Sequence, residues 1–206
     1  VKFTFNNIRT IEQLAARIDE QLETDSLSVL NAIKANETLE EMGFDRESVA
    51  ALFIPNTYEL YWNIDADDFV KKMINEYNHF WNEELLTKAK KQKLTPIEVS
   101  ILASIVDKET AKVSEMPRIA GVYLNRLKRN WLLQADPTLV FALGDFEIKR
   151  VLDVHKEIES PYNTYKYVGL PPGPICIPSI AAIDAVLNAE SHKYFYFCAK
   201  SDMSGY

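Results

Sequence analysis

One carboxylate in the sequence stands where a general acid would need to be. Glu109 comes near the end of a stretch, residues 95–110, whose apolar residues recur at helical spacing. At about 100° per residue, Glu109 lies roughly 20° from Leu102 and roughly 40° from Ile105, so its side chain continues the apolar stripe. A carboxylate on a buried stripe loses hydration, which disfavours its charged form and raises its pKa. A carboxyl group that stays protonated near neutral pH can act as a general acid.

The helix that would carry this carboxylate has a clear start. Thr95 is expected to cap the first turn, Pro96 suits the first helical position, and Glu98 completes a capping box. Asp107 lies roughly 140° from the centre of the stripe by the same count and should face another way. A glutamate near a helix end is more often solvated or ion-paired than catalytic, so the helix alone leaves both interpretations open.

The composition is that of a folded globular chain with an acidic balance. The chain has 206 residues, of which 47% are hydrophobic and 26% charged, as is ordinary for a globular protein. The formal net charge of -7 argues against general nucleic-acid binding, which needs a basic surface. No apolar run reaches the length of a transmembrane helix and no signal peptide opens the sequence. The last residues suggest a turn without a return strand, so we expect a fragment of a longer protein.

Common metal, nucleotide and serine-hydrolase signatures are missing from the sequence. The three histidines are scattered, and the two cysteines, Cys176 and Cys198, have no metal-binding spacing. We expect two buried thiols, although the sequence leaves a disulfide between them open. The sequence therefore predicts no metal site and no cofactor.

For the fold, the patterns predict a helix-rich α+β domain with a substrate groove around the capped helix. Residues 1–52 are expected to form a helical packing region, and residues 53–206 a core that carries the motifs. A long amphipathic helix is predicted over 65–87. Strand-like segments near Val1 and over 194–198 are expected to share a small sheet.

Three further segments carry candidates for contacts with a ligand. Residues 53–62 are rich in aromatic side chains, and Pro55 forces an extended or turning backbone, so this segment either plugs the core or forms a groove wall where Tyr58 stacks on a sugar. The segment before an Asp-Pro turn supplies Gln134 and Asp136.

The third segment is a loop over residues 160–175 with four prolines and two glycines, which preclude a regular helix or central strand. Its stiffness leaves little conformational entropy to lose on binding. Asn163, Thr164 and Tyr165 lie in this loop and are candidates for hydrogen bonds to a polar ligand. Packing within the loop or core is the competing interpretation for each of them.

Six short motifs resemble, in order and spacing, those of the YceG-like endolytic murein transglycosylase family. They are Pro-Asn-Thr-Tyr at 55–58, Ala-Ser-Ile-Val-Asp-Lys-Glu-Thr at 103–110, Asn-Arg-Leu at 125–127, Leu-Gln-Ala-Asp-Pro-Thr at 133–138, Ser-Pro-Tyr-Asn-Thr-Tyr at 160–165 and Gly-Leu-Pro-Pro-Gly-Pro-Ile at 169–175. The resemblance covers most of the chain, and the family's catalytic glutamate maps to Glu109.

The resemblance implies a reaction and a location. Members of the family cleave the β-1,4 bond between MurNAc and GlcNAc within peptidoglycan glycan strands and leave 1,6-anhydroMurNAc ends, without a cofactor. It further implies a bacterial protein anchored in the cytoplasmic membrane by one N-terminal helix, with its catalytic domain outside and cell-wall synthesis proteins as partners. A LysM-like module would precede the present sequence, and a C-terminal tail would follow it.

The sequence departs from the family pattern at three places. Asp107 stands where the family often has Glu, which should matter little because this position is off the apolar face. Asn56 replaces the usual Asp, which weakens the case for a second carboxylate there. The family's usual final segment is absent after Tyr206, so an incomplete site is possible.

Two other functions stay open at this point. A lysozyme-like hydrolase would use Glu109 with Asp136 or Asp107, because ordinary glycosidases need two carboxylates. A non-catalytic glycan-binding module or assembly scaffold would bind glycan strands without cleaving them.

Overall fold

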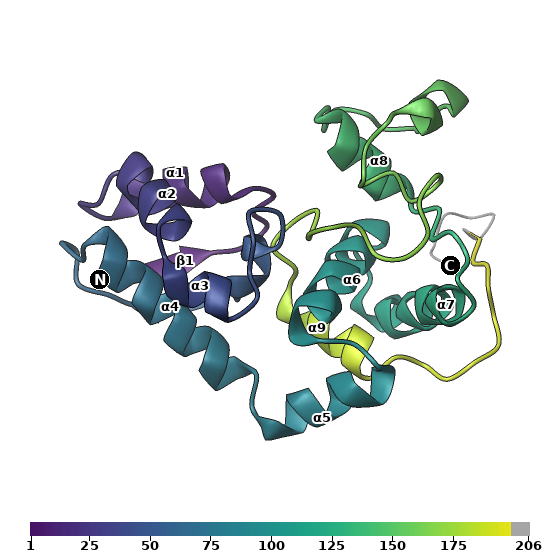
Figure 1. The fold of residues 1–206 in the computed structure, drawn as a ribbon, viewed down its shortest axis with the longest axis horizontal. Coiled ribbons are helices and arrows are strands. Elements are labelled where there is room, and N and C mark those ends of the chain that lie inside the picture. Colours follow the sequence, from purple (N-terminus) through teal and green to yellow (C-terminus); the bar gives the residue numbers. More distant parts are fainter. Residues whose placement is uncertain (199–206) are drawn as a thin grey trace.

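The computed structural model describes residues 1–198. Figure 1 shows the N-terminal helices gathered around a small sheet, and a second group of helices beside them. The elements are β1 (Lys2–Phe5), α1 (Ile11–Gln21), α2 (Ser26–Lys34), α3 (Glu37–Glu41), β2 (Asn56–Glu59), α4 (Ala66–Phe80), α5 (Glu83–Gln92), α6 (Pro96–Glu109), α7 (Met116–Lys128), α8 (Asp136–Leu143) and α9 (Ile180–Leu187), with short 3₁₀ turns at Val49–Leu52, Val113–Glu115 and Asp153–Glu157. The prediction of a helix-rich α+β domain is confirmed.

The sheet of the described chain is a two-stranded antiparallel pair, β1 with β2. Lys2 lies opposite Glu59 and Phe3 opposite Tyr58. Alternation along β1 turns Phe3 and Phe5 into the core, with exposed fractions of 0% and 2%, as a half-buried strand requires.

The prediction that residues 194–198 pair with the first strand was wrong. This segment has no regular secondary structure, and β1 instead pairs with β2. β2 lies within the aromatic segment 53–62, which was expected to plug the core or form a groove wall. Asn125 and Arg126 of α7 donate to the carbonyl groups of residues 192, 194 and 195, so side chains bond this part of the chain where a strand would use a ladder. The turn expected at 201–205 lies outside the described residues.

The single helix expected over 65–87 is in fact two helices. α4 ends at Phe80, and Asn82 caps α5 by accepting a hydrogen bond from the Leu85 amide at 3.1 Å. An asparagine at this point can end one helix and start the next, because its short side chain bonds free backbone amides. The division into a packing region over 1–52 and a motif-bearing core over 53–206 stays a prediction. The sheet joins the two parts, because β1 belongs to the first and β2 to the second.

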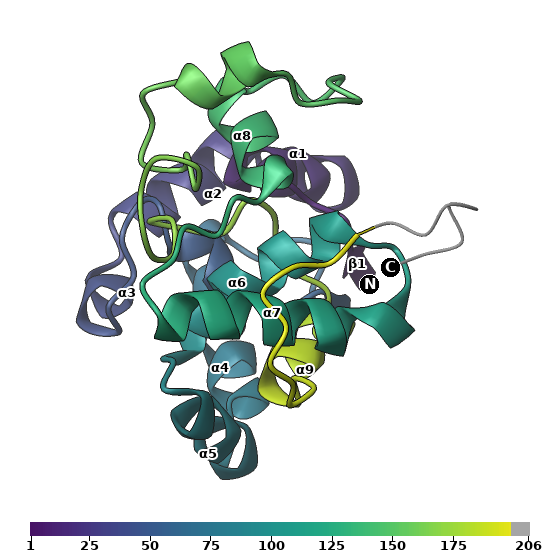
Figure 2. The same ribbon diagram turned by 90° about the vertical axis from the view of Figure 1, so that its right-hand side faces the viewer.

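Helix α6 lies at the centre of the second group of helices. Its residues from Val99 to Val106 are all buried, and it packs against α7, α8 and α9. Figure 2 shows α6 and α7 side by side, with α9 beneath them and α8 above. A helix that is buried on all sides is fixed by packing over its whole surface, so its last residue has a defined position.

The burial of the two cysteines can be compared with the prediction. Cys176 is buried and Cys198 is exposed, and both thiols are free, so the expectation of two buried cysteines holds only for the first. Between residues 1 and 198 no helix has both the length and the apolarity to cross a membrane.

Candidate active site

The start of α6 forms as the sequence predicts. The Glu98 amide donates to the Thr95 hydroxyl at 3.2 Å, and the Thr95 amide donates to Glu98 Oε2 at 2.7 Å. Both bonds satisfy backbone donors that the first helical turn leaves open. Asp107 turns away from the stripe, as predicted, and accepts a hydrogen bond from Ser179 Oγ, the N-cap of α9, at 2.6 Å.

Glu109 lies at the other end of α6 and is largely buried. Its pKa is raised from the ordinary value of 4.5 to about 7, mainly by burial and to a smaller extent by the negative charge of Asp136. A hydrogen bond from Tyr123 Oη to Glu109 Oε1, 2.7 Å long, and the positive charge of Arg126 work in the opposite direction. Near neutral pH this carboxyl group is therefore divided between its acid and base forms.

Glu109 opens into a pocket of about 350 Å³. Its lining residues are Arg9, Lys108, Glu109, Asp136, Pro137, Val140, Phe141, Phe146, Ile148, Lys149, Arg150, Val151 and Ile175. A larger cavity of about 840 Å³ adjoins it between the N-terminal helices and the proline-rich loop, sharing Arg9 and Phe141 but not Glu109. The smaller pocket is the candidate active site, because the carboxyl group with the shifted pKa lies in it.

Asp136, the first residue of α8, brings a second carboxylate to the same pocket. Its Oδ1 accepts a hydrogen bond of 2.5 Å from Tyr165 Oη, and the ring of Tyr165 lies under the Lys156 ammonium at 5.2 Å. Burial and the neighbouring carboxylate raise the pKa of the Tyr165 hydroxyl, so this group remains a donor. The structure thus brings together three predicted residues: Glu109, Asp136 and Tyr165.

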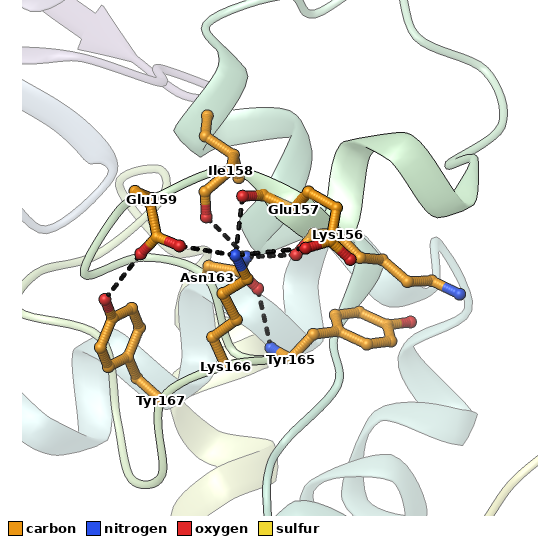
Figure 3. A network of polar contacts seen from close by, with 8 residues as sticks. All are labelled: Lys156, Glu157, Ile158, Glu159, Asn163, Tyr165, Lys166 and Tyr167. Carbon is orange, nitrogen blue, oxygen red and sulfur yellow. Dashed lines mark hydrogen bonds and ion pairs between the residues drawn. The ribbon is translucent and has the colours of Figure 1, made fainter.

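The loop that carries Tyr165 is held by Asn163. Figure 3 shows its amide donating to the Lys156 and Ile158 carbonyls, at 2.8 and 2.9 Å, while its oxygen accepts from the Tyr165 amide at 3.0 Å. Lys166 adds an ion pair with Glu159 in the same network. Asn163 is fully buried and its side chain is used inside the protein, so the direct substrate contact predicted for it becomes a positioning role.

Thr164 has the same kind of role. Its hydroxyl accepts from the Ala135 amide at 3.0 Å and lies 2.8 Å from the Thr138 hydroxyl, and only 2% of the residue is exposed. Its carbonyl accepts from the Gln134 amide at 3.0 Å. These bonds tie the loop to the start of α8, so Thr164 positions Asp136. Gln134 itself is exposed, with a left-handed backbone conformation (φ 50°).

Tyr58 is placed away from these residues. It lies on β2 with 5% of its surface exposed, its ring stacks on Phe5 at 5.8 Å, and its hydroxyl donates to the Ile54 carbonyl at 2.5 Å. With so little exposed surface it cannot offer a ring face to a sugar, so the structure gives this residue a packing role in place of the predicted stacking role.

Two residues of α7, Tyr123 and Arg126, also lie near Glu109. Tyr123 is not among the candidates drawn from the sequence, because it follows the apolar periodicity of its helix, but its hydroxyl donates the hydrogen bond to Glu109. Arg126 is buried and donates to the Phe195 carbonyl at 2.7 Å and the Leu133 carbonyl at 2.5 Å. A tyrosine hydroxyl in an apolar helix face needs a buried partner, and that was the signal available in the sequence for Tyr123.

Known proteins resemble this chain over most of its length. The sequence model of the YceG-like family matches residues 1–206. A Bacillus subtilis protein named endolytic murein transglycosylase is 38% identical over 136 residues, 66% of this chain and 37% of that protein. A protein of the same name from Streptococcus pneumoniae serotype 2 is 32% identical over 158 residues, 75% of this chain and 28% of that protein.

A similar fold has been solved. The crystal structure of a YceG-like protein from Listeria monocytogenes superimposes with a TM-score of 0.78 at 28% identity, over 97% of this chain and 70% of the other. The present chain spans about a third of the length of the curated relatives that it matches.

Proposed function

Because this chain belongs to the YceG-like family, we propose that it supplies the catalytic unit of an endolytic murein transglycosylase, with Glu109 as the acid and base. The observation that carries the proposal is the Glu109 carboxyl group, whose pKa of about 7 lets it exist in both protonation states at neutral pH. The lining of its pocket mixes apolar and polar side chains, as a site for a sugar chain requires.

In the first step Glu109 protonates the glycosidic oxygen between MurNAc and GlcNAc as the bond from this oxygen to C1 breaks. The GlcNAc hydroxyl leaves, positive charge develops at C1 of MurNAc, and Glu109 becomes a carboxylate. The hydrogen bond from Tyr123 stabilises this charged form.

In the second step the Glu109 carboxylate takes the proton from the C6 hydroxyl of the same MurNAc, whose oxygen attacks C1 and closes the 1,6-anhydro ring. The nucleophile belongs to the substrate, which reduces the entropic cost of bringing it to C1. Asp136 accepts a hydrogen bond from Tyr165 and lines the same pocket, which supports a role for its carboxylate in stabilising the positive charge at C1. Gln134, exposed before α8, is proposed as a contact to the sugar.

The hydrolase alternative is favoured by one observation, the presence of Asp136 in the Glu109 pocket. Two carboxylates facing one bond are the arrangement of ordinary glycosidases, in which the second activates water or attacks C1. Asp107, the other carboxylate considered, accepts its bond from Ser179 at the start of α9 and is not among the residues that line the pocket. A scaffold has no need of a buried carboxyl group in a pocket.

Mass spectrometry of the products from uncrosslinked glycan strands, with the full-length protein and its Glu109→Gln variant, tests the proposal. Internal fragments that end in 1,6-anhydroMurNAc, and are missing with the variant, are the expected result. Ends that carry an added water would instead establish a hydrolase. Full activity in the variant would remove Glu109 as the acid and base, and binding without products would support a scaffold.

We propose the same cellular setting for the whole protein as the resemblance implies. The catalytic unit would lie outside the bacterial cytoplasmic membrane, anchored by an N-terminal helix that is not in this sequence, beside proteins of cell-wall synthesis. The glycan strands that it would cut are made at this place. Fractionation of cells, followed by protease treatment from the outer face, tests the location.

A further inference from the structure

Four positively charged side chains surround the candidate active site. They come from the loop between β1 and α1, from the end of α6 and from the segment that follows α8, and we call them the cationic wall: Arg9, Lys108, Lys149 and Arg150. The pocket contains two carboxylates, Glu109 and Asp136, so cations outnumber them in a chain whose net charge is -7. The pocket lining therefore carries an excess of positive charge, whereas the whole chain carries a net negative charge.

The side chains of the cationic wall are not engaged in direct ion pairs within the described part of the chain. In residues 1–198 no ion pair joins any of the four to a carboxylate. A cluster of unpaired cations repels itself, and an anion at the pocket would relieve this repulsion.

Two members of the wall are held in place by neutral groups. The Arg9 guanidinium lies over the ring of Phe146, 4.3 Å from its centre, and Lys108 Nζ donates to Asn7 Oδ1 at 3.0 Å. The loop that supplies Arg9 and Asn7 is fixed in turn, because the Ile8 carbonyl accepts from the Ile177 amide at 2.8 Å. The geometry thus keeps these charges near the pocket without cancelling them.

The proposed substrate has anionic groups close to the bond that breaks. The sugar rings of a glycan strand are neutral, but the lactyl group of each MurNAc bears a peptide stem with free carboxylates. Glu109 acts on the bond at C1 of MurNAc, so the stem of that same sugar must lie next to the pocket. This step rests on the proposed function, since it uses the position of the bond.

We propose that the cationic wall binds the carboxylates of the peptide stem and selects glycan strands that carry anionic stems. Such strands would bind more tightly than strands whose stems have been removed, or whose stem carboxylates are amidated. The contribution is a charge interaction at a partly exposed site, so added salt weakens it. The N-terminal region, where the sequence alone indicated packing only, would contribute Arg9 to substrate selection.

The experiment measures binding to the full-length protein with the Glu109→Gln substitution, so that no strand is cut. Three strands of equal length are compared: one with free stem carboxylates, one with amidated stems and one without stems. Free stems are expected to bind about three- to tenfold more tightly than either of the others at low salt. Lys149→Gln with Arg150→Gln should bring the ratio close to one, because both residues are exposed and their loss removes two charges from the wall.

Lys90→Gln with Lys91→Gln is the matched control, since it removes two charges from the exposed face of α5 and should leave the ratio unchanged. Equal binding of the three strands would overturn the proposal, and so would a ratio that survives the substitution at 149 and 150. A loss of the ratio that the control reproduces would overturn it as well. Because binding is read without cleavage, the stem preference can hold or fail whether or not the products with the unsubstituted protein carry 1,6-anhydroMurNAc ends.

Discussion

Replacing Glu109 with glutamine should make the protein more stable, and increasingly so as the pH rises. Glu109 has a pKa of about 7 in the folded chain, against 4.5 as the ordinary value. Between these values the folded state binds more protons than the unfolded state, so the stability of the wild-type chain falls as pH rises through this window. Glutamine cannot ionise and can still accept the hydrogen bond from Tyr123, so the variant avoids this loss.

The size of the effect follows from the two pKa values. With 1.36 kcal/mol for each unit, ionisation of Glu109 costs the folded state about 3 kcal/mol at pH 8.5 but only about 1 kcal/mol at pH 5. The difference in unfolding free energy between variant and wild type should therefore grow by about 2.5 kcal/mol from pH 5 to pH 8.5. Differences that do not depend on pH, such as a change in packing, cancel in this comparison.

Urea denaturation at the two pH values, followed by tryptophan fluorescence, measures this difference. Glu41→Gln is a suitable control, because this exposed glutamate at the end of α3 stays in water in both states and should give the same difference at both pH values. If the difference in unfolding free energy between Glu109→Gln and wild type is also the same at both pH values, the raised pKa of Glu109 is refuted. The general-acid argument built on that pKa is then refuted as well.

Three further predictions concern the neighbours of Glu109. Tyr123→Phe removes a hydrogen bond that lowers the pKa of Glu109, so the alkaline limb of kcat/KM, expected near pH 7, should move up by about one unit; an unchanged pH profile would contradict this role. Asp136→Asn removes a negative charge that raises the same pKa and should move the limb to lower pH, and a change from water-added to anhydro products in this variant would identify the wild type as a hydrolase. Arg126→Met leaves two carbonyls without their donor and should cost about 2 to 4 kcal/mol in urea denaturation. Arg129→Met, which removes only a guanidinium lying over the ring of Phe195, should cost less than about 1 kcal/mol, and an equal loss in both would contradict the argument.

The sequence by itself determined α6 and the direction of its carboxylates. The capping box, the apolar stripe and the position of Glu109 on it depend on residues within a few helical turns, where geometry is fixed by the 3.6-residue period. The opposite direction of Asp107 follows from the same count. The motifs between 103 and 175 also identified the family, because they occur in a fixed order along the chain.

The strand pairing was beyond the sequence, because pairing is a contact between distant segments. Strand-like composition was recognised over 194–198, whereas it is residues 56–59, from the aromatic segment, that pair with β1, and Tyr58 stacks on Phe5 there. A pattern of apolar and aromatic residues does not say which partner a strand meets.

Only the tertiary structure decided which polar residues reach the pocket. Asn163, Thr164 and Tyr165 are neighbours in one loop, yet only Tyr165 extends to Asp136, while the other two are buried and hold the backbone. The ring of Tyr123 is buried in the core, as its place in the apolar pattern indicates. Its hydroxyl reaches Glu109 because α7 packs beside α6, and the sequence pattern does not show this contact. Burial and partners are properties of packed elements, and the pKa of Glu109 depends on them.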